Sequence, residues 1–148
     1  MNQIFAGGIS MLAVDWLKEG DSLYSQGRYA EAVRAYDEAL RLDPEDARAW
    51  SNKAAALAGM GKYIEAIRAC DESIRLDPEL ALAWNNRGFA LRNLGRLLEA
   101  IQAYDEALCI NPGYVRAWYN KGNALEALGK RSEASAAYAR AKELKLSE

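Results

Sequence analysis

The chain has 148 residues, 51% of them apolar, which is enough for one continuous hydrophobic core. Its formal charge of −2 argues against a nucleic-acid-binding protein, whose surface is usually strongly basic. It has no histidine, the commonest general base and metal ligand, and only two cysteines. We therefore expect no enzyme activity, no cofactor and no metal site. The absence of a disulfide framework favours a reducing, cytoplasmic location.

Residues 1–12 precede the first regular pattern. They lack the basic and apolar stretches of a secretory signal, and Gly7 and Gly8 argue against an early helix. No apolar run in the chain approaches the ~20 residues that span a bilayer, so we expect no membrane association. We interpret residues 1–12 as a leader that is disordered or left over from an expression vector.

From residue 13 onward the sequence repeats itself every 34 residues. The tryptophans of the chain all follow this period, at Trp16, Trp50, Trp84 and Trp118. Two further columns hold glycine and alanine, at Gly27, Gly61, Gly95, Gly129 and at Ala32, Ala66, Ala100, Ala134. The register predicts one domain, residues 13–148, made of four repeats at residues 13–46, 47–80, 81–114 and 115–148.

Each repeat is predicted to form two helices. In repeat two, Trp50, Leu57 and Met60 follow the spacing of one helical face. The column glycine suits a left-handed cap at the end of the first helix. Pairs such as Asp77-Pro78 are predicted to end the second helix and to cap the next one. We expect the second and third tryptophans to be largely buried, and the first to be more exposed because no repeat precedes it.

This pattern resembles the tetratricopeptide-repeat family, in which a tryptophan is followed by glycine, alanine, an aromatic residue and proline. In repeat three the matching residues are Trp84, Gly88, Leu91, Ala100, Tyr104 and Pro112. The resemblance implies an all-α protein, an α-solenoid of stacked antiparallel helix pairs in a right-handed superhelix. Two features depart from the family. The leucine before the glycine is replaced by Glu19, Lys53, Arg87 and Lys121, and Ala54 replaces the glycine itself in repeat two.

Polar residues mark both ends of the array. Asp15 and Ser22 replace alanines of the later repeats, and Ser135 and Lys142 replace aliphatic residues of the earlier ones. These positions would meet a neighbouring repeat, so their polarity predicts that four repeats are the whole array. We expect Ser135 and Lys142 to face solvent.

Little in the sequence points to chemistry. Cys70 stands in the column of the core tyrosines and is predicted to be buried, whereas Cys109 is predicted to be exposed without a base to activate it. Asp37 with Arg41, and the matching pair in repeat two, stand four residues apart and are expected to form surface ion pairs.

The resemblance implies a concave groove lined by the first helices. The candidate peptide-binding residues are Tyr24, Arg48, Asn52, Asn85, Asn86, Phe89, Arg92, Arg116, Tyr119, Asn120 and Asn123. Asn52, Asn86 and Asn120 recur once per repeat, and an amide offers both a donor and an acceptor to a peptide backbone. Alternatively, these amides bond only water or a neighbouring turn.

These observations favour an adaptor or scaffold that binds a protein or peptide. Because Arg48, Arg92 and Arg116 outnumber the acidic residues of the groove, we expect a ligand with an acidic residue or a free C-terminal carboxylate. The alternative is a structural element that forms homo-oligomers through its terminal helices.

Co-chaperone members of the family hold two carboxylates with a clamp of lysine, asparagine and arginine from three successive repeats. In repeats one to three the corresponding residues are Leu17, Asp21, Asn52, Leu82 and Asn86. In repeats two to four they are Ser51, Ala55, Asn86, Arg116 and Asn120. Neither set completes the clamp, so we expect no binding of chaperone tails by this arrangement.

Overall fold

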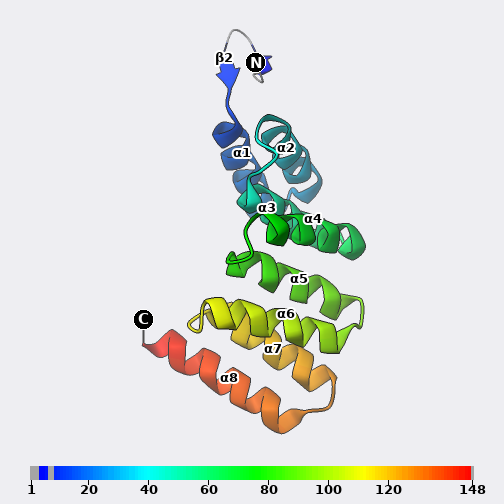
Figure 1. The fold of residues 1–148 in the computed structure, drawn as a ribbon, viewed down its shortest axis with the longest axis vertical. Coiled ribbons are helices and arrows are strands. Elements are labelled where there is room, and N and C mark those ends of the chain that lie inside the picture. The colour runs from blue at the N-terminus through cyan, green and yellow to red at the C-terminus, as the bar shows by residue number, and fades with distance from the viewer. Residues whose placement is uncertain (1–3, 7–8, 148) are drawn as a thin grey trace.

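The computed structural model describes residues 4–6 and 9–147, and the repeat region consists of helices joined by short turns (Figure 1). The helices are α1 (Ala13–Ser25), α2 (Tyr29–Leu42), α3 (Ala47–Gly59), α4 (Tyr63–Leu76), α5 (Ala81–Asn93), α6 (Leu97–Ile110), α7 (Val115–Ala127) and α8 (Arg131–Leu146). Successive helices pack as antiparallel pairs, and the pairs stack along the long axis of the molecule. The predicted all-α solenoid is confirmed.

Two short strands precede the repeats. β1 (Ile4–Ala6) pairs antiparallel with β2 (Ile9–Met11), and the hairpin lies beyond the start of α1 (Figure 1). The expectation for the leader falls partly on residues 1–3 and 7–8, which lie outside the described residues. Within those described residues, no helix has the length and apolar composition needed to cross a bilayer.

The helix boundaries follow from the glycine column and the proline turns. Gly27, Gly61, Gly95 and Gly129 have φ between +74° and +85°, the left-handed conformation that ends each first helix. Asp43, Asp77 and Asn111 end the second helices as predicted, but the prediction that they cap the next helices is wrong. Asp77 accepts a hydrogen bond from the Glu79 backbone at 3.0 Å within the turn, and Leu80 takes the N-cap position of α5. Aspartate therefore shapes the turn here and does not cap the helix.

The core depends on a close approach between a glycine of the first helix and a tyrosine of the second. A Cβ at Gly88 would lie 2.6 Å from the Tyr104 ring, and the pairs in repeats one and four are equally tight. In repeat two the same positions hold Ala54 and Cys70, both buried. The departure at Ala54 thus has a physical reason, because the smaller Cys70 leaves room for a methyl group.

The tryptophans are partly exposed in every repeat. Trp16, Trp50, Trp84 and Trp118 all have intermediate exposure, so the greater exposure expected for Trp16 stays a prediction. In the three later repeats the indole N–H donates to a proline carbonyl of the preceding exposed turn, as from Trp84 to Pro78 at 2.9 Å. This bond holds one edge of the ring at the surface.

The predicted surface ion pairs within helices are also wrong. Arg41 contacts Glu38, whereas Asp37 reaches across to Lys53 of the next repeat at 2.7 Å. The same link between repeats recurs from Asp71 to Arg87 and from Asp105 to Lys121. Lys53, Arg87 and Lys121, which replace the family's leucine in the later repeats, therefore join each of these repeats to the one before it.

The ends of the array differ from its middle as predicted. Ala49, Ala83 and Ala117 are fully buried against the preceding repeat. Ser22 at one end, and Ser135 and Lys142 at the other, are exposed. Cys70 is buried and Cys109 is exposed, as expected.

Candidate peptide-binding groove

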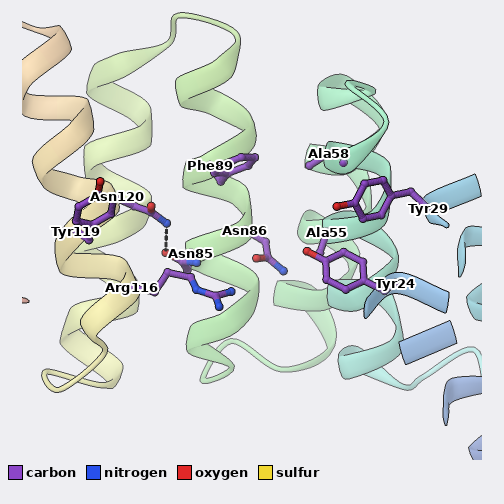
Figure 2. Close-up of a pocket in the computed structure, with 11 residues that line it drawn as sticks. Tyr24, Tyr29, Ala55, Ala58, Asn85, Asn86, Phe89, Arg116, Tyr119 and Asn120 are labelled. Atoms are coloured by element: carbon purple, nitrogen blue, oxygen red, sulfur yellow. Dashed lines mark hydrogen bonds between the residues drawn. The ribbon is translucent and has the colours of Figure 1, made fainter. Parts of the chain in front are cut away.

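The first helices α1, α3, α5 and α7 contact one another along the stack, and hollows lie on the face that they form. The hollow that extends along this face from α1 to α7, called the main hollow below, has a volume of about 590 Å³, and a larger one of about 880 Å³ lies at the C-terminal end. It is lined by Tyr24, Tyr29, Ala55, Ala58, Gly59, Asn85, Asn86, Phe89, Arg116, Tyr119 and Asn120. Figure 2 shows the two tyrosines Tyr24 and Tyr29 at one end, Asn86 and Phe89 in the middle, and Tyr119 with Asn120 at the other end.

Most of the residues predicted from the sequence lie together on this face. Tyr24, Asn85, Asn86, Phe89, Arg116, Tyr119 and Asn120 line the main hollow. An adjoining hollow of about 220 Å³ adds Arg48 and Asn52, and a third near the C-terminal end adds Asn123. Arg92 lines none of these three hollows. It is partly buried, and its guanidinium lies 5.6 Å from the centre of the Phe89 ring.

The sequence prediction missed the floor and one wall of the hollow. The prediction considered only residues of the first helices, whereas Tyr29 belongs to a second helix. Its ring forms an aromatic pair with that of Tyr24, with 5.3 Å between the ring centres. Its ring lies on Gly59, where a Cβ would come within 2.8 Å of it. The signal was a glycine as the last residue of a helix where the other repeats have larger side chains. With Ala55 and Ala58, Gly59 leaves the floor of the hollow open.

The asparagine ladder joins the repeats to one another. The Asn86 side-chain amide donates to the Ser51 backbone carbonyl at 3.1 Å, and that of Asn120 donates to Asn85 Oδ1 at 3.2 Å. Asn52 donates in the same way to Asp21 Oδ1 at 2.9 Å. An amide has two N–H donors and an acceptor oxygen, so each side chain keeps bonding capacity for a ligand.

The groove carries positive charge that the chain does not neutralise. Among the described residues, Arg48, Arg92 and Arg116 have no carboxylate within ion-pair distance. The acidic groups nearby are already engaged by tyrosine hydroxyls: Tyr36 donates to Asp21 at 2.8 Å, and Tyr138 donates to Glu126 at 2.8 Å. These two carboxylates keep their charge in such hydrogen bonds, but three arginines outnumber them, so the local field of the groove favours an anion although the whole chain is acidic.

Two titratable groups of the repeats, Cys70 and Tyr138, are held protonated by their surroundings. Burial raises the pKa of the Cys70 thiol to about 12. Burial and the hydrogen bond to Glu126 raise the pKa of Tyr138 to about 12. Within the described residues, no cluster of histidine, cysteine, aspartate or glutamate could hold a metal ion. The arrangement is suited to binding a ligand by hydrogen bonds, charge and apolar contact.

Family models cover nearly all of the repeat region. A model described as a TPR repeat matches residues 20–61, and models described as tetratricopeptide repeats match residues 47–80, 81–114 and 115–147. The chain belongs to the tetratricopeptide-repeat family. The columns of glycine, alanine and tryptophan are thus tetratricopeptide-repeat positions, and the groove is the concave face of a tetratricopeptide-repeat stack.

Individual relatives match over different spans. The Hsp70-Hsp90 organizing protein of Triticum aestivum is 43% identical over 44 residues, which are 30% of this chain. That stretch is 8% of the relative, so this chain spans a small part of the curated relatives it matches. A crystal structure of MamA is 27% identical with a TM-score of 0.79, covering 91% of this chain and 79% of MamA. The second TPR domain of human RPAP3, in complex with the HSP70 peptide SGPTIEEVD, is 29% identical with a TM-score of 0.71. The match covers 76% of this chain and 93% of the RPAP3 domain.

Proposed function

We propose that this protein is an interaction module whose concave groove holds a peptide segment of another protein. The observation that carries the proposal is the hollow that extends over all four repeats, where aromatic walls, amide groups and the unneutralised Arg116 converge on a floor of small residues. A pocket with an apolar lining and a few directed polar groups is typical of a ligand site. Membership of a family of protein-interaction scaffolds supports the same conclusion.

The ligand is a peptide with an acidic residue or a free C-terminal carboxylate. Arg116 lies in the hollow beside the amides of Asn86 and Asn120, so it can hold a carboxylate while they bond the peptide backbone. Phe89 and Tyr119 offer apolar contact to a neighbouring side chain. The peptide in the RPAP3 complex, which ends in Glu-Glu-Val-Asp, is a precedent for an acidic ligand on a related domain.

The contacts would differ from those of the co-chaperone clamp. The clamp positions in this chain include Leu17, Leu82 and Ala55, none of which can bind a carboxylate. Chaperone tails are therefore one class of acidic peptide to be tested, and we expect no preference for them over other acidic peptides.

Self-association through the terminal helices is the second candidate. Leu146 is 78% exposed on α8, and a hollow of about 880 Å³ there is lined by residues that include Tyr138 and Ala141. Head-to-tail stacking would nevertheless lack the ion pair that joins the internal repeats. Glu19 replaces its cation in repeat one, and Ala139 replaces its aspartate in repeat four.

The test begins with an array of acidic peptides that includes SGPTIEEVD, each with a free and an amidated C-terminus. The strongest binder is then titrated calorimetrically into the parent protein, Asn86→Ala and Arg116→Ala. Arg68→Ala is the matched control, because Arg68 is an exposed arginine of the second helix α4. We expect Arg116→Ala to weaken binding most, with the larger effect at low salt because charge attraction is screened by ions.

Two results would contradict the proposal. Undiminished affinity in Asn86→Ala and Arg116→Ala, with both variants folded, would place the ligand on another surface. A dimer or larger oligomer seen by light scattering, together with no binder on the array, would favour the self-association candidate.

A further inference from the structure

Three of the four repeats carry a tyrosine at the same position of the second helix, at Tyr36, Tyr104 and Tyr138. Each ring packs on a glycine of the first helix of its own repeat, so the hydroxyl occupies an equivalent position in each of the three repeats. A phenol hydroxyl donates one proton, and a buried donor without an acceptor is costly. The acceptor of each hydroxyl can therefore be compared from repeat to repeat.

In repeats one and four the chain supplies a carboxylate to the hydroxyl. Tyr36 donates to Asp21 Oδ1 at 2.8 Å, and the same oxygen accepts from the Asn52 amide at 2.9 Å. Tyr138 donates to Glu126 Oε2 at 2.8 Å and lies 2.7 Å from Asn123 Oδ1. The scaffold thus contains two examples of a carboxylate held against this hydroxyl.

In repeat three the carboxylate is missing. Phe89 stands at the position of Asp21, and Arg92 stands at the position of Glu126. Tyr104 is fully buried, and its hydroxyl has no hydrogen-bond acceptor among the described residues. The buried Nε of Arg92 also lacks a partner within that part of the chain. A guanidinium has donors only, so Arg92 cannot accept the Tyr104 proton.

The two unsatisfied groups lie next to each other. Burial raises the pKa of Tyr104, and both the positive charge of Arg92 and a hydrogen bond donated by its guanidinium to the phenol oxygen act against that effect, so the two side chains are in contact while the hydroxyl proton still has no acceptor. Arg92 is partly exposed and lies over the Phe89 ring, which lines the main hollow. Repeat three therefore presents two adjacent donors, one of them cationic, at the edge of the groove.

We infer that a carboxylate of the bound peptide completes this site, accepting hydrogen bonds from Arg92 and from the Tyr104 hydroxyl. The inference rests on the proposed peptide-binding function and adds a second anchor to Arg116. Because Tyr104 is fully buried, the Arg92 side chain has to rotate before the carboxylate can reach the hydroxyl. A carboxylate fits because its two oxygens can accept from both donors, as a single oxygen of Asp21 does in repeat one.

The site can be tested with acetate alone, before any peptide is known. Acetate is titrated against chloride at constant ionic strength, and the side-chain Nε–Hε signals of the arginines are followed by nuclear magnetic resonance. The Arg92 signal is assigned by its absence from Arg92→Glu. Arg75 serves as the control, because its guanidinium is already paired with Glu72 on an exposed surface. We expect a saturable shift of the Arg92 signal and no comparable shift of the Arg75 signal.

Two variants separate this site from a general attraction of anions. Tyr104→Phe removes only the hydroxyl and should weaken acetate binding about tenfold, the equivalent of a hydrogen bond to a charged group. Arg92→Glu places a carboxylate where repeat four has Glu126, so it should raise the melting temperature and remove the stabilisation of the protein by acetate. A matching loss of affinity for the array-selected peptide in both variants would extend the result to the ligand. Comparison of its free and amidated forms then tells a terminal carboxylate from a side-chain one.

An Arg92 signal that shifts no more than that of Arg75, or acetate binding unchanged in Tyr104→Phe, would overturn the inference. A peptide that binds the parent protein and depends on Arg116 but not on Arg92 would overturn it while leaving the proposed function intact. Loss of the proposed function itself would appear differently, as peptide binding indifferent to both arginines.

Discussion

Repeats one and three place a tyrosine against a glycine in the same way, but they differ in what the tyrosine hydroxyl contacts. In repeat one, Asp21 satisfies Tyr36 from within the chain. In repeat three, the corresponding position is Phe89, and Tyr104 has no acceptor among the described residues. The packing of tyrosine on glycine, which builds the solenoid, therefore does not depend on which group accepts the hydrogen bond of the tyrosine hydroxyl. A groove position can serve the stability of its own repeat or remain open to a ligand.

The largest expected effect comes from disturbing the shared packing. Gly88→Ala places a methyl group 2.6 Å from the Tyr104 ring, and we expect it to lower the free energy of unfolding by about 3 kcal/mol. Adding Tyr104→Cys reproduces the Ala54 and Cys70 pair of repeat two, so the double variant should lose less than the sum of its single variants. Urea denaturation measures each value.

The control for this cycle is Gly113→Ala, since the nearest atom to a Cβ there is 3.6 Å away. It should change the free energy of unfolding by no more than about 0.5 kcal/mol. Strictly additive losses for Gly88→Ala and Tyr104→Cys would mean that the glycine is not required by the tyrosine ring.

Truncation of a repeat-boundary tryptophan should have the next largest effect. Trp84→Ala removes a half-buried ring and its hydrogen bond to Pro78, so we expect a loss of about 2 kcal/mol, below that for a fully buried tryptophan. Trp16→Ala should cost less, because the Trp16 indole nitrogen has no acceptor among the described residues. Equal melting of Trp84→Ala and the parent protein would show that the ring is not part of the packing.

A direct comparison of the two tyrosine hydroxyls should give a smaller but more informative difference. Tyr36→Phe breaks a hydrogen bond to a carboxylate and should destabilise the protein by about 1.5 kcal/mol. Tyr104→Phe removes a buried donor without an acceptor and should be neutral or stabilising. Equal losses measured by denaturation would mean that Tyr104 has an acceptor in solution.

The smallest effect concerns alkaline pH. The pKa of Tyr138 is raised from 10.0 to about 12 in the folded protein, by burial and by the hydrogen bond to Glu126. A raised pKa stabilises the folded state below pH 10.0, and this stability is lost as pH rises from 10.0 to about 12. We expect Tyr138→Phe to flatten the dependence of the melting temperature on pH in that interval. An unchanged slope would show that Tyr138 titrates normally.

The 34-residue period was sufficient to predict the helix pairs, the glycine caps and the contrast between exposed ends and a buried alanine column. Its success has a physical reason, because helix boundaries and small core residues depend on local backbone geometry. The partners of polar side chains were harder to predict. Asp37 bonds across repeats to Lys53 and not within its helix to Arg41, since stacking brings a competing cation nearer.

The residues of the candidate groove were likewise predicted only in part. Recurrence identified the residues of the first helices, but Tyr29 reaches the hollow from a second helix, and only Gly59 hinted at it. The unsatisfied pair in repeat three depends on the direction of two long side chains, which a sequence column does not specify. Its signal was the replacement of an acidic position by Arg92, visible only when repeats one, three and four are compared.

The central claim, that the ligand lies in the concave groove, is tested most directly by mapping the bound peptide. The array-selected peptide is added to isotope-labelled protein, and the backbone amide signals are followed by nuclear magnetic resonance. We predict that the largest shifts fall on the groove side of α3, α5 and α7, around Ala55, Asn86 and Asn120. Shifts concentrated on the second helices α4 and α6, or on the exposed face of α8, would contradict the claim.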